Sequence, residues 1–251
     1  MWSKPIKRPN VFIGGEREDV DQSKIKENGA VRTTYKIDER FFEENQCIRL
    51  FGKNFVEKNK DKCRMLIAGK EYEVKEMMKK EEFGEYGIKE NDGVLEVRLK
   101  GKEIYDMSYM FCDCKSLIKV DLSSFNTRDI EDMTNMFFGC ESLNKLDLLS
   151  FKTQNVKMMA CMLYNCRNLI KLDLSSFNTP NLDKIPFMFW GCESLTKLDL
   201  SSFDVQNVTD MRGIFTLCKS LIKVNYGRKS FNKFKTESKN LEKSQLSIIE
   251  V

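Results

Sequence analysis

The chain contains no histidine and only four prolines among its 251 residues. Without an imidazole, neither histidine-based acid–base catalysis nor a histidine-ligated metal site is available. No apolar run approaches the roughly 18 residues that a membrane span needs, and no apolar segment follows the basic start at Met1–Pro9, so we expect neither a span nor a signal peptide. Neither sign of charge dominates, because 42 lysines and arginines stand beside 38 acidic residues. We therefore expect no nucleic-acid partner.

Cysteine is present in an odd number, nine, which argues against a disulfide framework. Cys112 and Cys114 are the one close pair, and they lack the two-residue gap and the second pair that are typical of a zinc site. Cys47 and Cys63 have no histidine to activate them as nucleophiles, and no glycine-rich phosphate loop is found. We therefore expect free thiols, no metal, no cofactor and no enzymatic activity.

A 26-residue repeat occupies the middle of the chain. One column of the repeat is cysteine, at Cys114, Cys140, Cys166, Cys192 and Cys218. A second column is phenylalanine, at Phe125, Phe151, Phe177 and Phe203. Columns of leucine and methionine keep the same period without an insertion. One unit buries almost nothing alone, so we expect stacked units whose columns form a continuous core.

Each unit divides into two halves with different hydrophobic periods. Apolar residues recur at three- and four-residue steps over Ile130–Cys140, which predicts a short helix that stops at Gly139. Leu146 and Leu148 alternate with polar residues within Leu143–Phe151, which predicts a strand. Equivalent strands of such an array are expected to run parallel.

The text L-x-x-L-x-L-x-x-F, preceded by M-x-x-M-F-x-x-C, resembles the BspA-like leucine-rich repeats. The closest text lies at Met136–Thr153, Met162–Thr179 and Met188–Val205. The resemblance implies an α/β fold: a leucine-rich-repeat solenoid of parallel short strands and short helices. Pro180 and Pro186 depart from the pattern and predict an irregular helix in their unit. Members of this family are mostly described as surface or interaction proteins without enzymatic activity.

The chain is predicted to have four parts. These are a loosely ordered segment at 1–30, a small α+β capping domain at 31–103, the repeat array at 104–226 and a C-terminal cap or tail at 227–251. In the capping domain we expect strands at Val31–Ile37, Cys47–Phe51, Arg64–Ile67 and Tyr72–Val74, and helices at Asn54–Lys62 and Lys75–Phe83. Ala68-Gly69 predicts a hairpin turn. The alternation in Val94–Leu99 predicts the strand that joins this domain to the array, and the tail predicts a polar helix followed by a short strand.

The outward positions of the array strands carry the candidate protein-contact face: Lys145, Asp147, Lys171, Asp173, Lys197 and Asp199. Lysine and aspartate two residues apart point to the same face of a strand. Two interpretations stay open, a contact surface and a solvated face whose charges neutralise each other. The sequence favours a non-enzymatic protein–protein interaction or scaffold module in the cytoplasm or another intracellular compartment. The alternative is a surface or secreted adhesin-type repeat protein.

Overall fold

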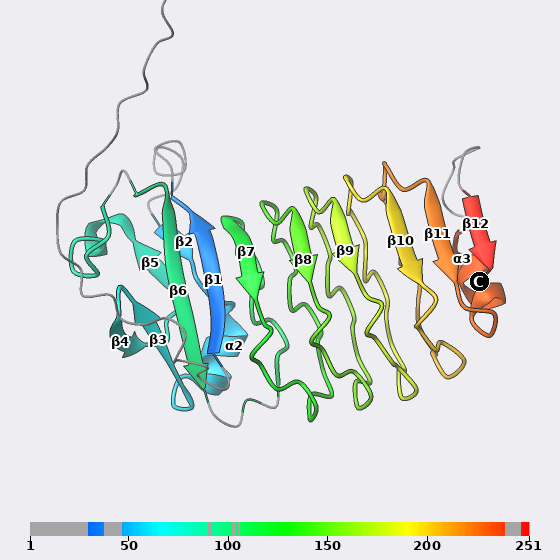
Figure 1. Ribbon diagram of the computed structural model, residues 1–251, viewed down its shortest axis with the longest axis horizontal. Coiled ribbons are helices and arrows are strands. Elements are labelled where there is room, and N and C mark those ends of the chain that lie inside the picture. The colour runs from blue at the N-terminus through cyan, green and yellow to red at the C-terminus, as the bar shows by residue number, and fades with distance from the viewer. Residues whose placement is uncertain are drawn as a thin grey trace, which may run out of the picture.

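A computed structural model describes residues 30–37, 47–89, 92–101, 104, 106–238 and 247–250. An N-terminal group of sheets lies at one end, and the strands of the repeat units follow side by side along the long axis (Figure 1). The loosely ordered segment predicted at the start of the chain lies, apart from Ala30, outside the described residues.

The N-terminal part is built on a five-stranded sheet with the order β4-β3-β6-β1-β7. Its strands are β1 (Ala30–Lys36), β3 (Cys63–Ile67), β4 (Lys70–Glu73), β6 (Val94–Gly101) and β7 (Leu117–Asp121). All of its pairings are antiparallel. A separate antiparallel pair joins β2 (Cys47–Arg49) to β5 (Met77–Lys79), and α2 spans Lys53–Asn59.

The short strands and the first helix predicted for this part are confirmed within a few residues. Ala68 and Gly69 connect β3 to β4 with positive φ angles of 49° and 80°, as the predicted hairpin turn requires. The helix predicted over Lys75–Phe83 is wrong. The chain forms β5 there, followed by the 3-10 helix η1 (Lys80–Glu82), because Met78 pairs with Ile48 of β2 and both are fully buried.

The junction with the array also differs from the prediction. β1, and not the strand predicted at Val94–Leu99, lies next to the first array strand. Thr33 of β1 pairs with Val97 of β6 on one side and with Val120 of β7 on the other. β6 is thus separated from the first array strand by β1, whereas the alternation of apolar and polar residues in Val94–Leu99 predicts direct contact.

Beyond β7, one strand appears in each unit. These strands are β8 (Lys145–Asp147), β9 (Lys171–Asp173), β10 (Lys197–Leu200) and β11 (Lys223–Tyr226), and β12 (Ser247–Glu250) follows. Parallel pairing joins β8 to β9, and it joins β10 to β11 and β11 to β12. In the described sheets β7 is not bonded to β8, nor β9 to β10, so the parallel strands form two short groups.

The helix predicted in each unit is absent from the described residues of 104–226, where the same segment is a run of turns. Its backbone N–H groups alternate between two kinds of acceptor. Asn135 and Phe137 donate to Ala160 and Met162 of the next unit at 2.9 Å each, while Met136 donates three residues back to Met133. An α-helix would need each N–H to bond four residues back along its own chain.

Left-handed residues enforce these turns. Asn135 has a φ of 55° and Gly139 a φ of 69°, and the equivalent positions of the next unit, Cys161 and Asn165, have 52° and 55°. Two left-handed residues four positions apart in each unit prevent the right-handed path of a helix. Pro186 fits this arrangement, since its carbonyl accepts from the Cys161 N–H and the ladder uses no N–H at its position.

The predicted fold class is therefore wrong. An α/β leucine-rich-repeat solenoid of parallel strands and short helices would contain one helix in each unit and a continuous parallel sheet. The described chain is mostly β structure and turns, and its largest sheet is antiparallel. Parallel strand pairing forms only the short groups β8–β9 and β10–β12 in the described sheets, and isolated parallel bridges join Asp132 to Met158, Met158 to Lys184 and Lys184 to Asp210.

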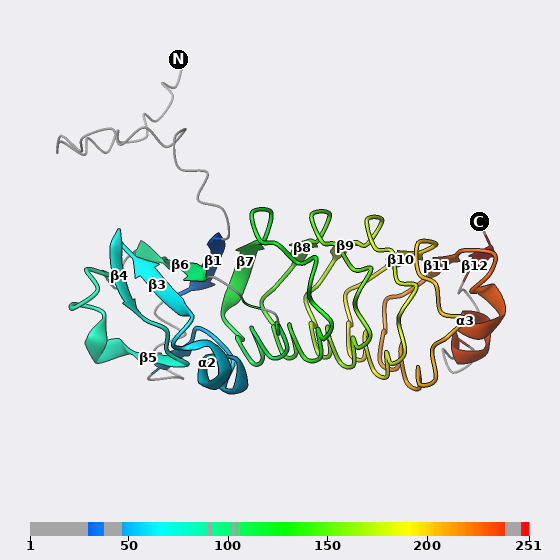
Figure 2. The ribbon, with the colours of Figure 1, turned by 90° about the horizontal axis from the view of Figure 1, so that it is seen from below.

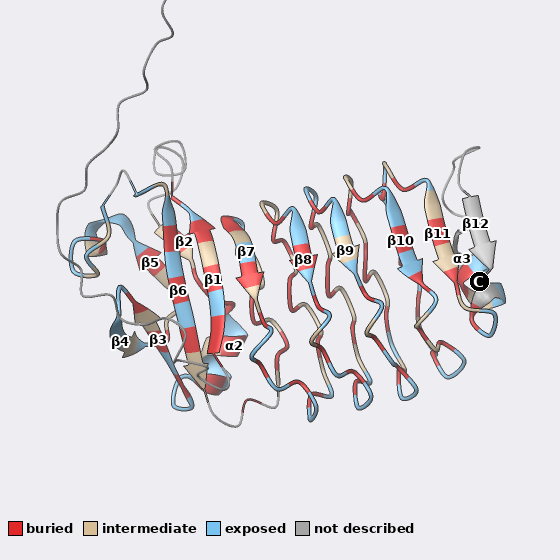
Figure 3. Cartoon of the chain, viewed as in Figure 1, coloured by how far each residue is buried: buried red, intermediate tan, exposed pale blue. Residues whose placement is uncertain are grey.

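One hydrophobic core runs through the N-terminal sheets and the array (Figure 3). The strands lie along one long side of the array and the stacked turns lie along the opposite side (Figure 2). Leu146 and Leu198 point into this core with exposures of 2% and 3%. Leu172, which the same alternation places inward, is only partly buried.

A helix and a strand end the described chain, as the tail predicts. The helix α3 (Phe231–Ser238) covers the last unit, where the Phe234 ring stacks on Tyr226 at 4.8 Å and contacts Phe215 at 6.4 Å. The strand β12 extends the parallel group beyond β11. The apolar end of the array is thus covered by an aromatic side chain from outside the repeat.

Candidate protein-contact face

The six candidate residues lie on β8, β9 and β10, and all six are exposed. Lys145 pairs in register with Lys171, and Asp147 with Asp173. Lys197 and Asp199 lie on β10, which is bonded to β11 and not to β9 within the described sheets. The structure therefore places the candidates in one lysine row and one aspartate row, across a break in the backbone pairing.

Both rows are longer than the predicted set. The lysine row contains Lys119, Lys145, Lys171, Lys197 and Lys223. The aspartate row contains Asp121, Asp147, Asp173 and Asp199, and Asn225 takes the next position. We call the surface formed by these two rows the sheet face. The 26-residue spacing already contains the signal for the added members.

Each aspartate of the sheet face is held by its own turn. One carboxylate oxygen of Asp147 accepts the backbone N–H of Leu149 at 3.0 Å, and Asp173 accepts that of Ser175 at 2.9 Å. The Ser175 backbone N–H lowers the pKa of the Asp173 carboxyl below its usual range. The carboxylates of the aspartate row are therefore held in place by backbone hydrogen bonds.

The lysines of the sheet face have no such partner. No carboxylate within the described ranges lies within ion-pair distance of Lys145, Lys171 or Lys197. The salt bridges between array units lie elsewhere, for example from Lys157 to Glu131 and from Lys219 to Glu193. The ammonium groups of the lysine row are therefore available to a bound molecule.

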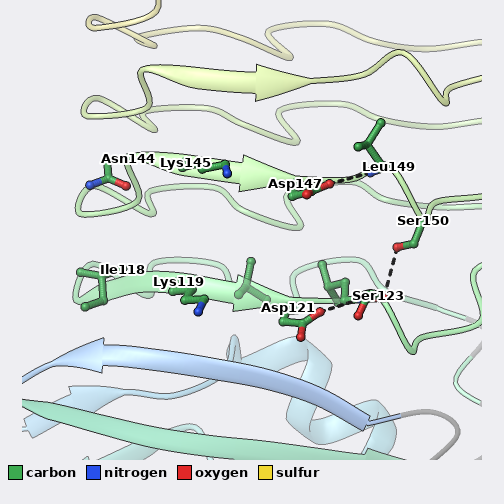
Figure 4. A pocket seen from close by; sticks show the side chains of 11 residues that line it. Ile118, Lys119, Asp121, Ser123, Asn144, Lys145, Asp147, Leu149 and Ser150 are labelled. Carbon is green, nitrogen blue, oxygen red and sulfur yellow. Dashed lines mark hydrogen bonds between the residues drawn. The ribbon is translucent and has the colours of Figure 1, made fainter. Parts of the chain in front are cut away.

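A groove of about 630 Å³ lies between β7 and β8. It forms where the sheet changes from antiparallel to parallel strands and the backbone pairing is interrupted. Lys119 and Lys145 lie toward one end of the two strands, and Asp121 and Asp147 lie toward the other (Figure 4). This groove continues the sheet face, and the sequence pattern alone did not indicate it because each unit carries the same residues at these positions.

The cysteine column is part of the core. Cys114, Cys140, Cys166, Cys192 and Cys218 are buried, and none of them forms a disulfide bond. Burial raises the pKa of the Cys166 and Cys192 thiols well above the usual value. These groups are neutral and shielded from solvent, so they are unsuited to nucleophilic chemistry.

Two cysteines outside the column also have raised pKa values. Burial raises the pKa of Cys63 to about 11 and that of Cys112 to about 12. Among the described residues, no group of three or more cysteine, aspartate or glutamate side chains is placed to hold a metal ion.

The phenylalanine column is buried beside the strands. The rings of Phe151 and Phe177 stack with centroids 6.4 Å apart, and those of Phe177 and Phe203 with centroids 5.5 Å apart. Phe125 begins the column with an exposure of 8%. The column supports the turns that follow the strands, so it fixes the base of the sheet face.

A column of buried hydroxyl groups was missed in the sequence. Thr153 is fully buried, and its hydroxyl donates to the carbonyl of Asn178 and accepts the N–H of the same residue, at 2.9 Å each. Thr179 makes the same two contacts with Asp204 of the next unit. The signal was available, because threonine recurs at the 26-residue spacing.

The comparisons with known proteins gave one family match, which covers the array and part of β6. Within the described chain, no helix is long and apolar enough to reach across a bilayer. Neither the curated proteins nor the solved structures include a significant match. Residues 96–196 and 170–245 match one family, and together these ranges cover more than half of the chain. The chain belongs to the family described as Mycoplasma protein of unknown function, DUF285.

Proposed function

We propose that this protein is a non-enzymatic protein-binding module and that the sheet face is its contact surface. The observation that carries the proposal is that Lys145, Lys171 and Lys197 have no carboxylate within ion-pair distance among the described residues, beside a row of aspartates fixed by their own turns. The aspartates are already positioned, so they lose little conformational entropy when a partner docks. Rows of mixed charge orient a partner and select against wrong ones more than they add affinity.

The chemistry of the thiols supports a non-enzymatic role. Cys114 and Cys140 are fully buried, and burial raises the pKa of each thiol well above its usual value. The chain has no histidine to activate them. We also propose an intracellular location, supported by nine cysteines without a disulfide bond, which is typical of a reducing compartment.

Site-specific photocrosslinking in the cells that make the protein tests the contact surface. A benzophenone amino acid at Asn144, which is exposed and lines the groove, should give a discrete adduct with another polypeptide. The same amino acid at Tyr164 is the control. Tyr164 lies in the turn segment on the other side of the core, between the rings of Phe138 and Trp190.

Charge reversal links the adduct to the lysine row. Lys171→Glu together with Lys197→Glu places acidic groups beside the aspartate row and should remove the Asn144 adduct by like-charge repulsion. Urea melts of the variant check that it is folded. An adduct only from Tyr164, none from either position, or one that survives the reversal would contradict the proposal.

A further inference from the structure

The two rows of the sheet face have the same period and opposite sign. Neighbouring members of a row lie about 4.8 Å apart where their strands pair, and a lysine and the aspartate of the same strand lie roughly 6.6 Å apart. The pairing registers place lysine beside lysine and aspartate beside aspartate. The face therefore presents one positive and one negative line along the long axis of the array.

A partner with one sign of charge fits this face poorly. An acidic segment would attract Lys171 and Lys197 but would meet Asp173 and Asp199 two residues further along each strand. A basic segment would have the opposite problem. The surface that matches both lines must carry a negative line opposite the lysines and a positive line opposite the aspartates.

We infer that this partner is a second copy of the same chain, docked sheet face to sheet face. A two-fold axis parallel to the array and midway between the rows lays each lysine row over the aspartate row of the other copy. Lys171 then faces Asp173 of the second copy, and Lys197 faces Asp199. Because both rows share one period, every unit is matched at once. This inference rests on the proposed function, since it names the partner of the same face.

Exposed apolar side chains flank the two charged rows of the sheet face. Ile170 and Ile222 lie just before the lysine row and are 54% and 44% exposed. Leu149 lies just after the aspartate row and is 48% exposed. By the same unit-by-unit match, Ile170 faces Ser175 of the second copy and Leu149 faces its Asn144, so these apolar side chains border the contact without pairing with each other.

The symmetry sets the size and the strength of the assembly. In a two-fold dimer the same face of both copies is buried in one self-complementary interface, so no further copy can bind there and association stops at the dimer. Ion pairs at an exposed face are individually weak and are screened by salt. The dimer is therefore a reversible one that weakens as ionic strength rises.

Sedimentation equilibrium of the full chain under reducing conditions tests the inference. The wild type should show a monomer–dimer equilibrium whose dissociation constant rises at least tenfold between about 0.05 M and about 0.5 M salt, where the screening length shortens several-fold. A chain that stays monomeric at low salt and high concentration overturns the inference. So does a dimer that is insensitive to salt.

Two triple variants identify the face. Lys145→Glu, Lys171→Glu and Lys197→Glu turn the lysine row negative, so two such copies repel each other. Asp147→Asn, Asp173→Asn and Asp199→Asn remove the negative row but keep the side-chain oxygen that accepts the turn N–H. Each variant alone should dimerise at least tenfold more weakly than the wild type, and urea melts verify that both are folded.

The mixture of the two variants is the decisive measurement. The aspartates that remain in the lysine variant can pair with the lysines that remain in the asparagine variant, so a heterodimer should form more tightly than either homodimer. A mixture that associates no better than its components overturns the inference. A monomeric wild type that crosslinks to a different protein through Asn144 overturns the inference and leaves the proposed function standing, whereas a chain that shows neither a salt-sensitive dimer nor an Asn144 adduct contradicts both.

Discussion

The thiol of Cys166 donates a hydrogen bond to the carbonyl oxygen of Phe137, 3.1 Å away and 29 residues earlier. The same oxygen accepts the backbone N–H of Cys140 at 3.2 Å. Equivalent thiol contacts are made by Cys140, Cys192 and Cys218, at 3.1, 3.2 and 3.0 Å. The cysteine column is therefore a ladder of hydrogen bonds between units as well as a packed column.

This ladder predicts the reactivity of the thiols. In the folded protein, titration with a disulfide reagent at pH 8 should label quickly no more than the three partly exposed cysteines, Cys47, Cys112 and Cys161. All nine should react in concentrated guanidinium, because unfolding exposes every thiol. Rapid labelling of Cys140 or Cys166 in the folded chain would show that the column is open to solvent.

The raised thiol pKa values predict a loss of stability in alkali. Burial raises the pKa of Cys166 and Cys192 in the folded chain, so above about pH 8.5 the unfolded state releases protons that the folded state keeps. Their contribution is complete below that pH and is lost as the pH rises toward the folded pKa. The double variant Cys166→Ala, Cys192→Ala lacks this pH-dependent contribution to the free energy of unfolding.

Urea melts between pH 7 and pH 10 measure the effect. The stability gap between wild type and this double variant should narrow by up to ~2.7 kcal/mol per pH unit once the unfolded thiols ionise, which is about 1.4 kcal/mol for each thiol. Comparing the two proteins cancels the titration of their shared lysines. A gap that stays constant with pH would mean that the two thiols ionise equally well in the folded state.

Burial of the strand leucines predicts which substitution by alanine lowers the stability of the fold. Leu198→Ala should lower the free energy of unfolding by about 2–5 kcal/mol, the usual cost of a large-to-small change in a packed core. The matched control is Lys197→Ala, one residue away and exposed, which should cost under about 0.5 kcal/mol. Leu172→Ala should cost less than Leu198→Ala, because Leu172 is only partly buried. Equal losses for Leu198 and Lys197 would reverse the assignment of the two strand faces.

The repeat period predicts much of the core but not the local backbone. Residues that recur every 26 positions occupy equivalent places in the stacked units, whatever the backbone conformation between them. The repeat period alone therefore predicts the burial of Cys166 and Phe177. The helix was predicted from apolar residues at three- and four-residue steps. Stacked turns with two left-handed residues four positions apart in each unit give the same spacing of apolar residues. Asn135 and Gly139 carried a signal against the helix, since asparagine and glycine favour left-handed angles.

Strand order was harder to predict than strand position. β1 and β6 alternate equally well, and each buries alternate residues over its length. Which of them meets β7 depends on contacts far apart in the sequence, such as Thr33 with Val120. The candidate face was predictable as two charged rows. The groove was not, because it depends on a break in pairing between β7 and β8, whose charged residues are the same as those of the paired strands.

The hydroxyl of Thr153 predicts a polar contribution to the stacking of units. Thr153→Val keeps the shape but leaves the N–H and the carbonyl of Asn178 without their hydroxyl partner, which should cost about 1–3 kcal/mol. Thr153→Ser keeps the hydroxyl and should retain most of the stability lost in the valine variant. Urea melts of the two variants measure the difference. A valine variant as stable as the serine variant would show that water or a shifted backbone replaces the contact.

The place of β1 predicts how the array depends on the N-terminal part. β1 lies between β6 and β7, with Val31 and Tyr35 fully buried and with Thr33 paired on both sides. A truncation that removes residues 1–37 opens the edges of both neighbouring strands and exposes the core beneath them. Because unpaired strand edges and uncovered apolar surface promote association, this fragment should aggregate or melt far below the full chain.

The control removes residues 1–29 and keeps the whole of β1, so it should stay monodisperse under the salt conditions in which the full chain is monomeric. Light scattering and thermal melts of both fragments test this. A 38–251 fragment that is monodisperse and as stable as the control would show that the array closes its own first edge and that β1 is dispensable to it.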